Sequence, residues 1–186
     1  PYRGEHQVWL QELLGINPSE QSAASSLDFI KAVVAQRNYK SEEEIAQIEE
    51  AVDISVDMHV KAMQMVRPGM KESEVAAAVT EIALSRGWGL SFPVIATING
   101  QTLHNHDHSH TMQEGQMLLL DAGAENNMHY CGDLSSTMPV GKHFTDRQRT
   151  IYNILYAAHQ EAVKALRPGI NFRDVHMLTV TKICEG

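Results

Sequence analysis

The sequence predicts an α+β fold in which a pair of helices occurs twice. The motif Arg67-Pro68-Gly69 recurs one hundred residues later as Arg167-Pro168-Gly169, with no gap in the alignment of the two copies. Identical residue types recur at the same offset in both flanking segments, at Ile54, His59, Ala62 and Val75. A Pro-Gly turn alone could match by chance, because long helices often end in this way. The flanking identities favour duplication of a supersecondary unit.

The segments before the first of these turns are predicted to be helical. Short helices are expected over residues 7–14 and 26–36, and neither carries a chemical motif. Ser41 and Glu44 then have the spacing of a capping box. Apolar residues at helical spacing follow, so a long amphipathic helix is expected up to Pro68.

A second helix, residues 72–86, completes the first copy, because Gly87 and Gly89 follow it. The apolar pattern then changes to that of strands separated by turn residues, and strands are expected over residues 92–98, 116–125 and 128–140. Thr145 is expected to cap the long helix of the second copy. No strands follow this copy, so we expect the chain to be part of a longer protein whose second half is truncated here.

Composition and charge exclude several classes of protein. The 186 residues are 43% hydrophobic, which suffices for a folded core, and the formal charge is −8. This charge argues against nucleic acid as a partner, because binding a phosphate backbone needs clustered Lys and Arg. No segment reaches the roughly 18 apolar residues of a membrane span, so no membrane partner is expected. Cys131 and Cys184 form no CxxC motif, and a reducing, cytoplasmic location is expected.

Two aspartates lie within consecutive apolar segments. Asp121 follows Leu118-Leu119-Leu120, and Asp133 comes twelve residues later. If these segments form a hairpin whose loop is centred on Asn127, the two carboxylates lie directly opposite each other on the face away from Leu120 and Leu134, with Cβ atoms about 4.5–5.5 Å apart. Such like charges repel unless a divalent cation lies between them. A lone Asp is more often a turn or cap residue, but the pair favours a metal site.

Four histidines alternate with polar residues between the first two predicted strands. On an extended chain all four would share one face, where they could bind nickel or zinc. The Asn, Asp and Ser residues between them favour a solvated loop for His106, His108 and His110. His104 differs because it follows the apolar Leu103, and it is a candidate to point into a site.

These motifs resemble the metallopeptidase family that includes Xaa-Pro aminopeptidase, prolidase and methionine aminopeptidase, which has the duplicated pita-bread (creatinase/aminopeptidase) fold. The resemblance begins near Lys40, is greatest to the Xaa-Pro aminopeptidase branch, and implies that residues 1–40 end an N-terminal domain and linker. Residues 41–186 would then be the first half of the catalytic domain and the start of its second half. The resemblance is carried by Lys40-Ser41-Glu42-Glu43-Glu44-Ile45, Arg67-Pro68-Gly69-Met70, Phe92-Pro93, Leu103-His104, Asp121-Ala122-Gly123-Ala124-Glu125, Gly132-Asp133-Leu134, Phe144-Thr145 and Gln148.

The resemblance also implies an activity and roles for the candidate residues. Asp121 would chelate one of two divalent metal ions and Asp133 would bridge both, with manganese expected and cobalt or zinc as alternatives. His104 would be the catalytic, substrate-binding histidine. A metal-bridging hydroxide would hydrolyse the bond between an N-terminal residue and proline in small peptides, and the full-length protein would be a homo-oligomer. The family's remaining His and two Glu ligands have no counterpart in this chain.

The sequence departs from the family pattern at two points near the aspartates. The separation of Asp121 and Asp133 is one residue longer than usual, and Ser136 stands where Arg is common. A catalytically inactive peptide- or protein-binding module on the same fold is therefore the alternative, since fold does not fix function. The presence of both aspartates and His104 favours the enzyme. A His-rich metal-storage protein is a third hypothesis, supported only by the histidine run.

Overall fold

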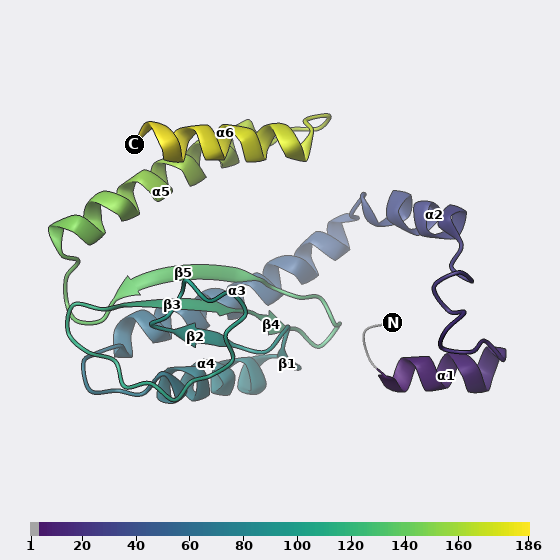
Figure 1. Cartoon of the computed structure of the whole chain (residues 1–186), viewed down its shortest axis with the longest axis horizontal. Coiled ribbons are helices and arrows are strands. Elements are labelled where there is room, and N and C mark those ends of the chain that lie inside the picture. The colour runs from purple at the N-terminus through teal and green to yellow at the C-terminus, as the bar shows by residue number, and fades with distance from the viewer. Residues whose placement is uncertain (1–3) are drawn as a thin grey trace. The chain divides into compact units, whose positions relative to one another are not determined.

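The structure is a computed structural model that describes residues 4–186, which divide into two units between Ile45 and Ala46. The first unit contains α1 (Gly4–Leu14) and α2 (Leu27–Arg37), as Figure 1 shows, so both predicted short helices are confirmed. The predicted domain boundary after residue 40 stays a prediction. None of the helices in the described residues is long and apolar enough to cross a membrane.

The first helix pair forms as predicted, except that its first helix ends at Met65, before the predicted end at Pro68. α3 (Glu42–Met65) begins at the predicted capping box, in which Ser41 N–H donates to Glu44 Oε2 at 2.9 Å and Glu44 N–H donates to Ser41 Oγ at 3.2 Å. α4 (Glu72–Arg86) ends at Gly87. These local signals were sufficient to predict where the helices begin, because capping groups satisfy backbone N–H groups that have no partner inside the helix.

The second helix pair consists of α5 (Asp146–Ala165) and α6 (Phe172–Glu185). Thr145 caps α5 as predicted, and its Oγ1 accepts from the N–H of Gln148 at 3.3 Å. The Gln148 side chain also donates to the Gly115 carbonyl at 2.8 Å, which ties the start of α5 to the turn before the central strand. α5 and α6 pack directly against each other, whereas α4 packs on strands.

The two Arg-Pro-Gly turns have the same local geometry. Gly69 has a φ of 89° and Gly169 a φ of 85°, in the left-handed region that favours glycine. In each copy the arginine guanidinium donates to the carbonyl two residues before it, at 3.2 Å for Arg67 and 3.1 Å for Arg167. The repeated turn is therefore confirmed at the level of its hydrogen bonds and backbone.

The strands form two antiparallel sheets. β1 (Gly89–Leu90) pairs with β4 (Ala124–Glu125), while the larger sheet has the order β2-β3-β5. The bounds of its strands are β2 (Ile95–Thr97), β3 (Met117–Ala122) and β5 (Leu134–Pro139). The antiparallel arrangement of the three predicted strands is confirmed. The third strand is shorter than expected, because the hairpin turn described below occupies the start of its predicted range.

One hydrophobic core lies between the larger sheet and the helices α3 and α4, which lie beside it in Figure 1. Side chains of β3 alternate between buried and partly exposed, so that one face of this strand enters the core. The strand residues in the core include Leu118, Leu120, Ala122 and Met138. The helix residues include Ile54, Met58, Ala62, Val75 and Val79. The opposite face carries the polar side chains of Asp121, Ser135 and Thr137 together with the apolar side chains of Met117 and Leu119.

Replacing Leu120 by Ala is expected to lower the free energy of unfolding by about 2–5 kcal/mol, because the fully buried side chain would leave a cavity. Leu103 is 78% exposed, and Leu103→Ala is the matched control, with an expected change within about 0.5 kcal/mol. Urea denaturation of both variants measures the difference. Equal effects of the two substitutions would contradict this assignment of the core.

Candidate active site

Asp121 and Asp133 lie on the same face of the sheet, diagonally rather than directly opposite each other. The residue that pairs with Asp121 is Ser135, and its hydroxyl donates to Asp121 Oδ1 at 3.0 Å. Asp133 lies two residues before Ser135 and therefore projects to the same side. The predicted common face, away from Leu120 and Leu134, agrees with this register. The predicted direct opposition is wrong.

The register differs because the hairpin turn is centred on Met128 instead of Asn127. Glu125 pairs with Cys131 across the turn. The side-chain Oδ1 of Asn126 accepts from the backbone N–H groups of Met128 and Tyr130, both at 3.0 Å. This local hydrogen bonding is typical of Asn in turns. Within this turn His129 has a positive φ of 65°.

Asn126 also fixes the hairpin to α3. The residue is 1% exposed, and its Nδ2 donates at 2.9 Å to both Gln47 Oε1 and Glu50 Oε2. A buried amide with partners on both of its ends holds one orientation. The turn that joins the two aspartate-bearing segments is therefore held by a helix that lies far away in the sequence.

Gly123 allows the two segments to approach closely just after Asp121. A Cβ at position 123 would lie 1.9 Å from the carbonyl oxygen of Gly132, so no other residue fits without movement of the backbone. Close by, Ser55 Oγ accepts from Ala124 N–H at 2.9 Å and donates to the Ala51 carbonyl at 2.7 Å. Asp121 therefore lies two residues before the position at which Gly123 and Gly132 approach closely.

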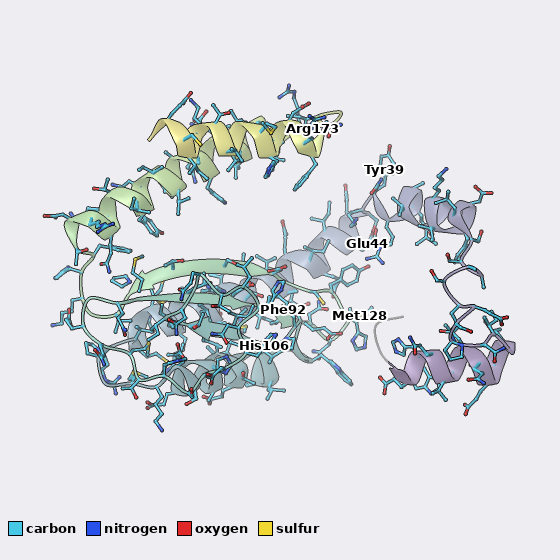
Figure 2. The ribbon with its side chains drawn as sticks, in the orientation of Figure 1. Tyr39, Glu44, Phe92, His106, Met128 and Arg173 are labelled. Carbon is cyan, nitrogen blue, oxygen red and sulfur yellow. The ribbon has the colours of Figure 1, made fainter. Side chains whose placement is uncertain are left out.

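The three candidate residues line one pocket of about 320 Å³. His104 comes from the loop between β2 and β3, where it is exposed and has a φ of 54°. The remaining lining residues are Phe92, Pro93, Ile95 and His106, of which Phe92 and His106 are labelled in Figure 2. The structure therefore brings together residues that are up to 41 positions apart, from Phe92 to Asp133.

The pocket has the chemistry of a partial metal site. Asp121 and Asp133 supply carboxylates, and neither Lys nor Arg is among the residues that line the pocket. A divalent cation would neutralise these charges, and carboxylate oxygens suit hard cations such as manganese. Within residues 4–186, however, no group of three or more His, Cys, Asp or Glu side chains is arranged to hold a metal ion.

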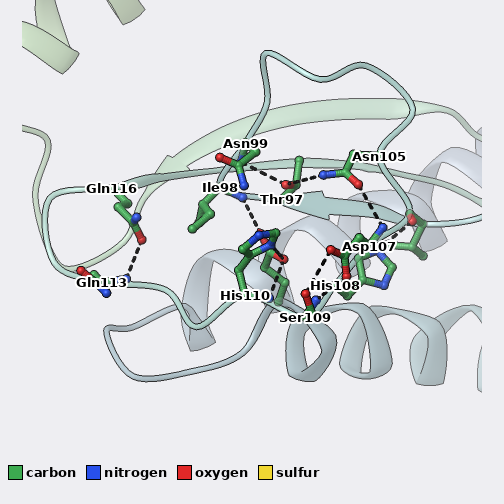
Figure 3. A network of polar contacts seen from close by, with 12 residues as sticks. Thr97, Ile98, Asn99, Asn105, Asp107, His108, Ser109, His110, Gln113 and Gln116 are labelled. Atoms are coloured by element: carbon green, nitrogen blue, oxygen red, sulfur yellow. Dashed lines mark hydrogen bonds and ion pairs between the residues drawn. The ribbon is translucent and has the colours of Figure 1, made fainter.

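The solvated-loop interpretation holds for His106, which is exposed, but is wrong for its two neighbours. Nε2 of His108 is 3.1 Å from the Val94 carbonyl oxygen, and Nδ1 of His110 is 3.0 Å from Oε2 of Glu72, as Figure 3 shows for the region. Sequence reasoning missed Glu72 because an acidic residue in the first helical turn is ordinarily explained by the helix dipole. Its complete burial is visible only in the structure.

Ser136, the second departure from the family pattern, lies on the core side of the sheet rather than in the pocket. It pairs with Leu120, and its Oγ is 2.6 Å from Nδ1 of His59 on α3. Nε2 of His59 is 3.1 Å from the Ala122 carbonyl oxygen. Because a carbonyl only accepts, the neutral form of this imidazole would carry its proton on Nε2 and accept from the Ser136 hydroxyl at Nδ1. Ser136 is not among the residues that line the pocket.

Comparison with known proteins identifies the family. The model of metallopeptidase family M24 matches residues 46–186, and the chain belongs to this family. Xaa-Pro aminopeptidase from Escherichia coli strain K12 is 34% identical over 157 residues, which cover 82% of this chain and 35% of that protein.

Solved structures of aminopeptidase P share the fold. A Glu-to-Ala variant of the Escherichia coli enzyme in complex with substrate has a TM-score of 0.74 and 32% identity, covering 79% of this chain and 34% of that chain. The zinc-substituted Escherichia coli enzyme in complex with product has a TM-score of 0.72 and 32% identity, covering 77% and 33%. The predicted α+β pita-bread fold is thereby confirmed. The chain spans about a third of the length of these relatives.

Proposed function

We propose that the chain forms part of a metal-dependent aminopeptidase that hydrolyses the bond between an N-terminal residue and proline. The observation that carries this proposal is the single pocket lined by Asp121, Asp133 and His104 in a member of metallopeptidase family M24. The similarity to a protein named Xaa-Pro aminopeptidase supports the substrate class. Small peptides with proline in second position are the proposed substrates.

Asp121 would chelate one divalent ion, and Asp133 would bridge it to a second. Manganese is the proposed metal, with cobalt or zinc as alternatives, and the zinc-substituted relative supports metal dependence. When bound, the two ions would supply a bridging hydroxide at neutral pH and positive charge for the developing oxyanion. The Ser135 hydroxyl, which donates to Asp121 Oδ1, would hold that carboxylate in one orientation.

The remaining pocket residues would bind and orient the peptide. The His104 imidazole would donate a hydrogen bond to the scissile carbonyl oxygen, where negative charge develops. Phe92, Pro93 and Ile95 give the pocket an apolar wall, which suits the ring of a proline residue and excludes water from it. This apolar wall favours a substrate whose second residue is apolar.

The test is hydrolysis by a full-length enzyme that contains this chain. We expect cleavage of a tripeptide with proline in second position and much slower cleavage of the same tripeptide with alanine there. Treatment with a chelator should abolish turnover, and added manganese should restore it. Binding of the proline peptide without turnover, at saturating metal, would instead identify the inactive binding module. Homo-oligomerisation and a cytoplasmic location stay predictions, which light scattering and cell fractionation can test.

A further inference from the structure

The carboxylate of Glu72 joins the two ends of the loop that carries His104. This loop, residues 99–109 and called here the His104 loop, lies between Ile98 and His110. Oε1 of Glu72 accepts from the Ile98 backbone N–H at 2.7 Å, while Oε2 accepts from the His110 backbone N–H at 3.3 Å and is 3.0 Å from His110 Nδ1. Figure 3 labels Ile98 and His110, the two residues that flank the loop, and marks polar contacts in this region with dashed lines.

The first turn of α4 also bonds to the loop through its backbone. Glu72 N–H donates to the His110 carbonyl at 3.0 Å, and Ser73 N–H donates to the His108 carbonyl at 3.1 Å. The first N–H groups of a helix have no partner inside that helix, so the loop carbonyls satisfy donors that would otherwise need water. The loop is thus attached to the start of α4, next to the buried carboxylate.

Side-chain hydrogen bonds order the interior of the loop. Thr97 Oγ1 accepts from Asn99 N–H at 3.0 Å and from Asn105 Nδ2 at 3.2 Å. Asp107 accepts from Ser109, and this side-chain hydrogen bond is the main reason that the pKa of Asp107 is lowered. These contacts involve residues on both sides of His104 in the sequence, and His104 has a positive φ that is unusual for a residue with a side chain and needs support from its neighbours.

We propose that Glu72 is a positioning residue that holds His104 in the conformation in which it faces the pocket. The proposal rests on the proposed function, because it assigns a catalytic consequence to the place of His104. Glu72 is 0% exposed, so its carboxylate depends on the loop donors as much as the loop depends on it. A carboxylate accepts from both ends of the loop at once. A glutamine amide cannot, because its nitrogen only donates.

Glu72→Gln in the full-length enzyme is expected to lower kcat for the proline tripeptide by about 10- to 100-fold, since small displacements of a catalytic group have effects of this size. Bound metal should be unchanged, because neither aspartate contacts Glu72. Glu81→Gln is the matched control, since Glu81 is exposed on the same helix. It should retain wild-type kcat.

A double-mutant cycle distinguishes positioning from general stability. If Glu72 acts through His104, then Glu72→Gln should lower kcat no further in a His104→Ala background. His110→Ala keeps the backbone donors and removes only a side chain that is 40% exposed, so it should fold and show a smaller loss than Glu72→Gln. Hydrogen exchange of the His104 loop should be faster in Glu72→Gln than in Glu81→Gln.

Three outcomes would overturn the proposal. They are wild-type kcat in Glu72→Gln, an equal further loss in the His104→Ala background, and unchanged hydrogen exchange of the His104 loop. A full-length protein that lacks peptidase activity altogether would refute the proposed function instead. The exchange measurement needs no activity, so it would still decide whether Glu72 holds the loop in that case.

Discussion

Asp121→Asn and Asp133→Asn in the full-length enzyme are each expected to abolish hydrolysis of the proline tripeptide. Asn keeps the shape of Asp but removes its charge, so the proposed metal ions lose a ligand and part of the negative charge that balances their own. The loss should exceed the roughly 10- to 100-fold that removal of an outer partner of a metal ligand costs. Steady-state kinetics at saturating manganese, with measurement of bound metal, gives the result.

Two control variants separate ligand loss from disruption of the fold. Asp53→Asn replaces an exposed aspartate on α3 and should leave kcat/KM unchanged. Ser135→Ala removes the hydroxyl that donates to Asp121, and its effect should lie between those of Asp53→Asn and Asp121→Asn. The aspartates are partly exposed or exposed, so both Asn variants should fold normally. Near-normal turnover by either Asn variant would exclude the proposed metal roles.

The helices could be predicted from the sequence because their ends depend on local chemistry. Ser41 with Glu44, and Thr145 with Gln148, form the expected capping hydrogen bonds. Gly87 ends α4 where the pattern indicated. Such signals act within one helical turn, so no knowledge of the tertiary structure is needed to recognise them.

The register of the aspartate hairpin depends on a contact from a distant part of the chain. Asn126 and Asn127 are equally plausible turn residues in the sequence, and the choice of centre shifts the partner of Asp121 by two positions. In the structure Asn126 is buried against Gln47 on α3, which selects the turn centred on Met128. A shift of two residues preserves the face of every side chain. This explains why the predicted common face of the aspartates is correct although their predicted direct opposition is wrong.

The contacts of Glu72 also come from a distant part of the chain and could not be predicted from the sequence. Glu72 and His110 are 38 positions apart, and each has an ordinary local explanation, as a residue of the first helical turn and as a member of a polar loop. Only the approach of the loop to the start of α4 buries the carboxylate and gives it three donors. Alternation of the four histidines suggested a common role, whereas the structure gives them different surroundings.

The 186-residue chain by itself is expected to show no peptidase activity, whereas a full-length enzyme containing it should be active. The pocket supplies two carboxylates, and a dinuclear site needs further bridging and terminal ligands to hold both ions. Exposed apolar side chains on α5, including Ile151, Leu155 and Tyr156, should also lead the isolated chain to self-associate. Peptide hydrolysis with added manganese, cobalt or zinc, together with light scattering, measures both expectations.

The full-length enzyme under the same conditions is the positive control for this comparison. Weak metal binding by the short chain, detected by titration calorimetry, would agree with a partial ligand set and should disappear in a chain carrying both Asp121→Asn and Asp133→Asn. Turnover by the short chain at a rate near that of the full-length enzyme would contradict the expectation. The catalytic site would then lie entirely within these residues, and Asp121, Asp133 and His104 would have to act without further metal ligands.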